Sequence, residues 1–356
     1  MNKIKESIKI SLSRHTVPQK MNYIKYLMLN KSEVLNYDPV TLSIVATTRC
    51  TLSCDMCPTH SSIVPKDYPH TQKARSDMNF AMFRDIIDRF RNATTVHIIG
   101  SGEPLLNKDF FRMVDYAARN KMVVKTFSNG TLVEDNIDNI LSSKLNGITV
   151  SINGHDGKEF KRMTGMDEGV YYKIYTGVKK LVEQKKSKKS GVKVKLSFII
   201  DKMNYKLIHE MIDLSLDLGV DHAFFCNFLP SPFKGLSADE RVLPADNAIM
   251  SEMKDALRIY PSEVRSRFTL PIFVDIKEFM NKCRTHFSQI RFDGDGNVSS
   301  CSMMLLDMTG HGNYKDADVW NNAFFRDMRR RFLSPGDELI PEPCSVCPDN
   351  RGVEIG

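Results

Sequence analysis

Short apolar runs alternate with amphipathic segments between residues 41 and 228, and this alternation strongly limits the folds open to the chain. The runs that we predict as strands are 42–46, 96–99, 123–127, 147–152, 193–199 and 222–228. Helices predicted between them include 80–90, 110–119, 172–182 and 205–218. Such alternation is typical of parallel β/α units. Six units predict an α/β fold, a partial (β/α)6 TIM-like barrel with ligand sites at the carboxyl ends of its strands.

Three cysteines come directly after the first predicted strand. Cys50, Cys54 and Cys57 have the spacing C-x3-C-x2-C. Cysteine thiolates select iron–sulfur clusters or zinc. Because three thiolates leave one coordination position free, the motif predicts a reactive metal centre rather than a purely structural one. Taken alone, the triad is also compatible with part of a zinc site or with a structural cluster.

A glycine-rich turn with one carboxylate ends the second predicted strand. It reads Gly100-Ser101-Gly102-Glu103-Pro104. Glycine lets a backbone approach a ligand closely, and Glu103 can accept hydrogen bonds from an ammonium group. The turn therefore predicts a ligand site at the same end of the barrel as the cysteines.

The spacing of the cysteine triad resembles that of the radical S-adenosylmethionine (SAM) enzymes. The resemblance implies that the three thiolates hold a [4Fe-4S] cluster whose fourth iron chelates the amino and carboxylate groups of SAM. A flavodoxin or ferredoxin-type protein would reduce this cluster, and SAM would be cleaved to a 5′-deoxyadenosyl radical. Gly102, Glu103 and Pro104 resemble the Gly-Gly-Glu element that holds the SAM amino group, although Ser101 replaces its first glycine.

Polar residues also follow the third and fourth predicted strands. Asn129 resembles the asparagine of the family's Thr-Asn-Gly turn, but Asn-Gly is equally a common tight turn. Ser151 and Asn153 resemble the family's ribose-binding Ser-x-Asp-Gly element. In this chain Asn153 replaces the aspartate of that element, and asparagine carries no charge. Arg162 is either a partner for a carboxylate or a surface residue of a helix.

Four further cysteines lie towards the C-terminus. They are Cys283, Cys301, Cys344 and Cys347. Two pairs of thiolates can close a site with four ligands. Their order resembles the twitch domain, a shortened relative of the SPASM domain, and this implies that they fully ligate one auxiliary [4Fe-4S] cluster. Zinc stays an alternative, because a four-thiolate site with one C-x2-C is also typical of zinc.

The eighth cysteine, Cys226, lies near the end of the sixth predicted strand. A free cysteine is most often a small buried hydrophobe. The alternative, suggested by radical epimerases of the same family, is a thiol that returns a hydrogen atom to a substrate radical. His97, His155 and His222 lie on or beside predicted strands, where a lone histidine is more often structural than catalytic.

Composition and charge limit the class of protein and its location. The 356 residues are 42% hydrophobic with a net charge of +7, which suits a globular protein and is not by itself a nucleic-acid-binding signature. No apolar stretch approaches the ~20 residues that span a bilayer, and the N-terminus lacks the features of a signal peptide. We therefore expect a cytoplasmic protein whose cysteines bind metal rather than form disulfides.

We predict four segments along the chain. They are an N-terminal helical extension over 1–38, a radical SAM partial barrel over 39–232, a linker over 233–280 and a twitch-like iron–sulfur domain over 281–356.

Together these motifs predict a radical SAM enzyme, an oxidoreductase or epimerase. We expect it to abstract a hydrogen atom from a small polar substrate such as an amino sugar or cyclitol. Dehydrogenation, with the auxiliary cluster as electron acceptor, or epimerisation would follow. A peptide or protein maturase is an alternative, which we favour less because a leader-binding domain of ~80–90 residues is too large to fit before the first strand. A non-catalytic iron–sulfur or zinc protein is the third hypothesis.

Overall fold

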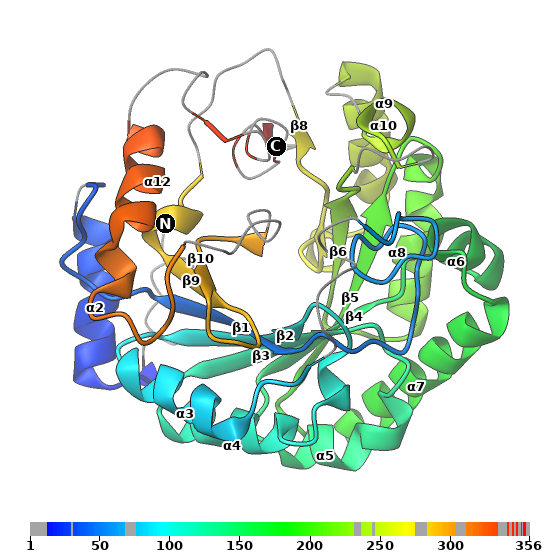
Figure 1. Ribbon diagram of the computed structural model, residues 1–356. Helices are drawn as coiled ribbons and strands as arrows, with labels where there is room; N and C mark the ends of the chain where they lie inside the picture. The colour runs from blue at the N-terminus through cyan, green and yellow to red at the C-terminus, as the bar shows by residue number, and fades with distance from the viewer. Residues whose placement is uncertain are drawn as a thin grey trace.

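One curved sheet of nine strands forms the frame of the molecule (Figure 1), with the order β10-β9-β1-β2-β3-β4-β5-β6-β7. The computed structural model describes residues 13–29, 31–67, 76–230, 236–243, 246–274, 283–302, 311–333, 340–341, 344, 347, 350 and 352–353. The strands of the sheet are β1 (Thr41–Thr47), β2 (Thr95–Gly100), β3 (Val123–Ser128), β4 (Gly147–Ser151), β5 (Lys193–Ile200), β6 (His222–Asn227), β7 (Phe268–Thr269), β9 (Gln289–Phe292) and β10 (Val298–Ser299). Two more strands, β8 (Phe273–Val274) and β11 (Gly352–Val353), pair separately.

The six predicted strands are confirmed as β1 to β6, each within one residue of its predicted ends. Neighbouring strands from β1 to β7 run parallel, so all their carboxyl ends lie at one end of the sheet. Side chains alternate between the two faces of a strand. Leu42 and Ile44 are therefore buried under the outer helices, whereas Ser43 lies on the inner face, in register with His97 of β2.

Helices cover the outer face of the sheet, and Figure 1 shows α3, α4, α5 and α7 along its convex side. Their apolar residues recur at helical spacing, as in α4, where Phe110, Met113, Val114 and Ala117 are buried. The described helices are α2 (Val17–Met28), α3 (Phe80–Arg89), α4 (Phe110–Arg119), α5 (Ile137–Ser142), α6 (Gly157–Thr164), α7 (Glu168–Ser187), α8 (Ile208–Asp217), α9 (Ala238–Arg241), α10 (Asn247–Arg258), α11 (Ser262–Arg265) and α12 (Ala323–Leu333).

Two predicted helices differ from the observed ones at their ends. The segment predicted at 172–182 is the middle of α7, which begins earlier because Asp167 caps it by accepting a hydrogen bond from Gly169 N at 2.7 Å. The segment predicted at 205–218 opens with a 3-10 turn, Tyr205–Leu207, before α8.

The barrel is open, because its end strands β7 and β10 are not neighbours in the sheet. This is the predicted partial barrel. Strand β9 pairs in parallel with β1, with Arg291 opposite Ser43, so the sheet continues past the boundary predicted at residue 281. The division of the chain into domains stays a prediction.

Helix α2 lies against the loops that precede β2 and β3, at the amino ends of the strands. The side-chain amide of Gln19 donates hydrogen bonds to the carbonyls of Ala93 (3.0 Å) and Asn120 (2.9 Å). None of the described helices is long and apolar enough to cross a membrane. The expected cytoplasmic location stays a prediction.

Candidate active site

The loop that follows β1 carries Cys50, Cys54 and Cys57 at the carboxyl end of the barrel. A hydrogen bond of 2.9 Å from Cys57 N to Cys54 O turns this loop, and Asp55 N donates to Thr164 O of α6 at 2.8 Å. Burial, together with the nearby Cys57 and Cys50, raises the pKa of Cys54 to about 12. The three thiols are thus close enough to repel one another as thiolates, an arrangement that a cationic centre stabilises.

The turn after β2 packs directly on the start of the cysteine loop. Glu103 N donates a hydrogen bond of 2.8 Å to Arg49 O. A Cβ atom on Gly102 would lie only 1.9 Å from that same carbonyl oxygen. Glycine is therefore required at residue 102 for the two loops to approach this closely.

The carboxylate of Glu103 is fully buried and joins the ends of β2 and β3. It accepts hydrogen bonds from Asn129 N (2.7 Å), Ser128 Oγ (2.9 Å) and Leu105 N (3.1 Å). Burial raises the pKa of Glu103, whereas these hydrogen bonds oppose the rise. A buried carboxylate with donors on both oxygens holds the two turns at a defined separation.

Asn129 serves both as a turn residue and as a neighbour of the cysteines. Its Oδ1 accepts a hydrogen bond from Thr131 N at 3.1 Å, as expected for a turn. Its Nδ2 lies 3.5 Å from Cys50 Sγ and 3.0 Å from Thr51 Oγ1. The two interpretations that the sequence left open are therefore compatible.

Ser151 and Asn153 lie at the carboxyl end of β4. Ser151 Oγ is 3.1 Å from Ser197 Oγ of β5. Asn153 is buried, with a left-handed backbone (φ 50°), and its Oδ1 has no hydrogen-bond partner within the described part of the chain. A buried acceptor without a donor is costly, so this oxygen suits a ligand hydroxyl group.

Arg162 of α6 has its carboxylate partners within the protein. It donates to Glu159 Oε1 and Oε2, both at 2.7 Å, and lies 3.4 Å from Asp201 Oδ1. The Asp201 carboxylate, fully buried after β5, also pairs with Arg241 at 2.7 Å. Sequence reasoning missed Asp201, because nothing local indicates that two arginines from distant segments converge on it.

The side chain of Cys226 on β6 is exposed, so its interpretation as a buried hydrophobe is wrong. It lies two residues after Phe224 and thus on the same face of the strand, the inner face of the barrel. The strands around the thiol nevertheless desolvate it and raise its pKa.

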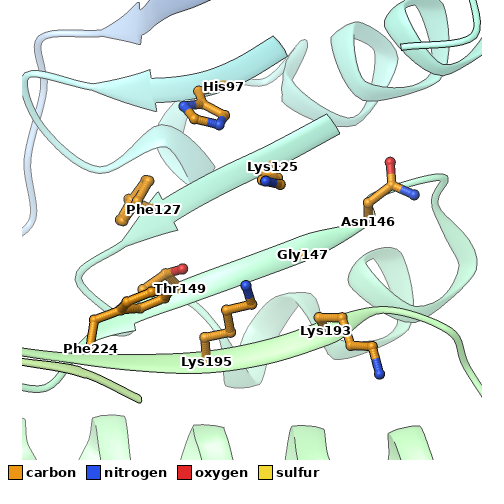
Figure 2. A pocket seen from close by; sticks show the side chains of 9 residues that line it. All are labelled: His97, Lys125, Phe127, Asn146, Gly147, Thr149, Lys193, Lys195 and Phe224. Carbon is orange, nitrogen blue, oxygen red and sulfur yellow. The ribbon is translucent and has the colours of Figure 1, made fainter. Parts of the chain in front are cut away.

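The inner face of the sheet encloses a cavity of about 270 Å³. Figure 2 shows its lining from β2 to β6, including His97, Lys125, Phe127, Lys195 and Phe224. Sequence analysis missed the two lysines as candidate site residues. The sequence signal that could have identified them is that each lies inside a predicted strand, 123–127 or 193–199, in the middle of a parallel sheet. A second, wider hollow of about 590 Å³ opens beside Cys50, Arg49 and His60.

The four C-terminal cysteines gather in one region although up to 64 positions separate them (347 − 283). Cys283 and Cys344 are buried, and Cys301 and Cys347 are half-buried. Burial raises the pKa of Cys344, and the proximity of the other three thiols adds to this rise.

Arg291 of β9 is a buried charged residue that lies close enough to Cys301 to interact with it electrostatically. Burial lowers the pKa of Arg291 to about 10, while Cys301 and Asp293 oppose the shift. Its Nε is buried without a hydrogen-bond partner among the described residues.

Neither set of cysteines closes around a single ion. Within the described residues, no three His, Cys, Asp or Glu side chains form a site for one metal ion. In a [4Fe-4S] cluster each thiolate binds a different iron atom, so the sulfur atoms need not converge on one point.

Comparison with known proteins shows which class this fold and site resemble, the radical SAM enzymes. Residues 44–215 match the family model of the radical SAM superfamily. Over this segment, which is just under half of the chain, the protein is similar to radical SAM enzymes, which bind SAM and an iron–sulfur cluster. The unpartnered Asn153 Oδ1, the close approach at Gly102 and the three thiols of the triad all fit these cofactors.

Among curated relatives, a GTP 3′,8-cyclase of Vibrio vulnificus is 29% identical over 146 residues, which are 40% of this chain and 41% of the relative. A probable GTP 3′,8-cyclase of Saccharolobus islandicus is 26% identical over 207 residues, 56% of this chain and 65% of the relative. The matches thus span less than two thirds of either relative.

Solved structures share the fold at low sequence identity. Streptococcus suis SuiB bound to S-adenosylmethionine superposes with a TM-score of 0.65 at 17% identity, over 91% of this chain and 75% of SuiB. The anSMEcpe structure with bound AdoMet gives a TM-score of 0.63 at 15% identity, over 88% and 89% of the two chains.

Proposed function

We propose that this enzyme removes a hydrogen atom from a small polar substrate held inside the barrel, such as an amino sugar or cyclitol, with dehydrogenation or epimerisation as the outcome. One observation carries the proposal: the cysteine triad lies at the mouth of a barrel that encloses a cavity of about 270 Å³. When bound and reduced, the [4Fe-4S] cluster and SAM together supply a 5′-deoxyadenosyl radical that takes hydrogen from unactivated C–H bonds.

The residues around the triad have separate roles in this proposal. Glu103 would accept a hydrogen bond from the SAM ammonium group, in addition to those it already holds. Asn153 Oδ1 and Ser151 would accept hydrogen bonds from the ribose hydroxyl groups. Asn129 would donate to the Cys50 sulfur, and a hydrogen bond of this kind helps to set the potential of a cluster.

The size of the cavity favours a small molecule over a peptide. Its volume of about 270 Å³ is near the lower end of the range of ~300–1,000 Å³ that ligand pockets occupy. Dehydrogenation and epimerisation both begin with hydrogen abstraction, and they differ in whether the protein returns a hydrogen atom afterwards. Cys226, exposed on the inner face, is the residue that would do so.

We also propose that Cys283, Cys301, Cys344 and Cys347 hold one auxiliary [4Fe-4S] cluster. The proposal rests on the proximity of these four thiols, which raises the pKa of Cys344. A flavodoxin or ferredoxin-type protein would supply electrons to the SAM-binding cluster.

The decisive experiment is SAM cleavage by the anaerobically reconstituted protein. With dithionite and SAM, we expect 5′-deoxyadenosine from the wild-type protein and none from a Cys54→Ala variant. We also expect SAM to perturb the paramagnetic signal of the reduced cluster. The proposal would be overturned if the triad binds zinc, or if the protein binds its iron–sulfur cluster but does not cleave SAM.

Deuterated substrates then identify the substrate class. Deuterium that enters 5′-deoxyadenosine from a sugar or cyclitol supports the proposal, whereas deuterium that enters only from a peptide would replace it with a maturase function. Iron content tests the auxiliary cluster: about eight irons per wild-type chain should fall to about four in a variant with all four C-terminal cysteines changed to alanine.

A further inference from the structure

The inner face of the barrel carries an unusual set of charges. His97 of β2 lies in register with Lys125 of β3, and Lys195 of β5 lies in register with His222 of β6. Side chains of one register row share a face, and Figure 2 shows His97, Lys125 and Lys195 lining the cavity on the inner face of the barrel. No acidic residue is among the nine that line the cavity.

Two of these cations have no counter-ion in the part of the chain that the structure describes. Neither Lys125 nor Lys195 forms an ion pair there, and Lys195 Nζ instead lies 5.3 Å from the centre of the Phe224 ring. Lys193, which lines the same cavity, is compensated, because it pairs with Asp221 at 3.2 Å. The cavity thus holds an excess of positive charge at two defined positions.

The charges lie close enough together to affect one another's pKa. Burial lowers the pKa of Lys125, and Lys195 lowers it further. Burial, together with the nearby Lys125, lowers the pKa of His97 to about 4, so His97 is neutral near pH 7. An anion between the two lysines would relieve their repulsion, and a neutral His97 could donate a hydrogen bond to it.

Aromatic side chains form the next layer towards the mouth of the barrel. Phe127 follows Lys125 by two residues, and its side chain is 45% exposed on the inner face. Phe224 contributes a second ring to the lining of the cavity. Figure 2 shows both rings nearer the carboxyl ends of the strands than Lys193. Together they offer a flat apolar surface between the lysines and the cysteine triad.

We propose that the cavity takes a phosphorylated small molecule, with its phosphoryl group between Lys125 and Lys195 and its sugar ring or base against Phe127 and Phe224. This inference rests on the proposed function and specifies its substrate class. Lysine binds phosphate as a point charge, and two lysines without counter-ions among the described residues match the multiple negative charge of a phosphoryl group. The phosphate end would lie deepest, because Lys125 is three residues (~10 Å) from the carboxyl end of β3 and Lys195 is five residues (~17 Å) from that of β5. The reacting carbon would lie nearest to Cys50.

Calorimetric titration of the reconstituted holoenzyme with matched pairs of ligands tests this inference. The probes are inorganic pyrophosphate, glucose 6-phosphate against glucose, and guanosine 5′-monophosphate against guanosine. We expect at least one phosphorylated probe to bind, and its unphosphorylated partner to bind at least about tenfold more weakly. Which organic phosphate binds distinguishes a sugar phosphate from a nucleotide.

Charge-removing variants locate the site. Lys125→Met and Lys195→Met should each weaken phosphate binding about tenfold or more, and the melting temperature should stay equal or rise because repulsion is removed. Lys193→Met is the matched control, since this lysine lines the same cavity but is paired with Asp221, and its affinity should stay within about twofold.

The outcomes separate this inference from the proposed function. Failure of all three phosphorylated probes to bind, or equal binding by Lys125→Met, Lys195→Met and wild type, would overturn the inference. SAM cleavage by the wild-type protein is measured separately without any of these probes. Cleavage without phosphate binding would leave the proposed function standing, and phosphate binding without cleavage would refute the proposed function alone.

Discussion

The backbone nitrogen of Asn129 donates a hydrogen bond of 2.7 Å to the buried carboxylate of Glu103. Through this contact the turn after β3 is held against the turn after β2, and the Asn129 side chain is held 3.5 Å from the Cys50 sulfur. One carboxylate thus links three loops at the mouth of the barrel. The contacts that link these loops come from the protein itself.

Replacement of Glu103 by Gln should weaken both the loop contacts and SAM binding. An amide has one acceptor oxygen, so the Asn129 or the Leu105 nitrogen would lose its partner, at a cost of about 2 kcal/mol. We expect SAM affinity, followed by the paramagnetic signal of the reduced cluster, to fall about tenfold or more. Glu134→Gln is the control, because among the described residues Glu134 pairs with the exposed Lys180 at the surface, and its loss should change stability by less than about 0.5 kcal/mol.

Gly102→Ala should disrupt the cysteine loop. The added Cβ would meet Arg49 O at 1.9 Å, so the backbone has to move, and we expect a loss of about 3 kcal/mol of stability. Iron bound after reconstitution should fall together with the melting temperature. Gly191→Ala, where a Cβ meets nothing within 4 Å, should alter neither quantity. Full iron content in the Gly102 variant would contradict the structural role of this glycine.

The Asn153→Gly variant distinguishes two roles of Asn153, adopting a left-handed backbone and offering an unpartnered side-chain oxygen to a ligand. Glycine adopts the φ of 50° without strain, so the free energy of unfolding should change little. The variant lacks the unpartnered Oδ1, and we expect SAM to bind about fivefold more weakly for the loss of one hydrogen bond. Unchanged SAM affinity would mean that the asparagine serves the backbone alone.

Cys226→Ala should change what happens after hydrogen abstraction. If the exposed thiol returns a hydrogen atom, wild-type product formed in D2O carries solvent deuterium at the reacted carbon, and the variant product does not. Cys226→Ser should behave like the alanine variant, because an O–H bond is too strong to donate its hydrogen atom. Unaltered stereochemistry and turnover in both variants would end the role of Cys226.

His286 should make the fold sensitive to acid. Burial, with Arg329 and Lys31 nearby, lowers the pKa of His286 to about 3 from 6.5. The unfolded chain therefore binds one more proton than the folded chain between these values, and stability is lost as pH falls through this window. Denaturant titration at pH 7.0 and 5.5 should show a loss about 1 kcal/mol larger in wild type than in His286→Phe, whose ring can keep the contact with Phe332. An equal loss in both proteins would refute the assignment.

Local sequence pattern was sufficient to predict much of the barrel. Strands β1 to β6 were predicted within one residue because apolar runs, turn residues and helix caps are encoded by neighbouring residues. The cysteine triad could be located for the same reason: its spacing and its position after a strand are both local. The pairing of β9 with β1 was not predictable, since it joins residues about 250 positions apart through the curvature of the sheet.

The chemical surroundings of the site depend on that curvature. The sequence by itself determined the strands, the cysteine loop and the polar turns at the strand ends. Only the tertiary structure decided that Asp201 lies between Arg162 and Arg241, that Cys226 is exposed, and that Lys125 and Lys195 share a cavity. The physical reason is that a strand specifies which face a side chain occupies, whereas the closure of the sheet specifies which other side chains it meets there.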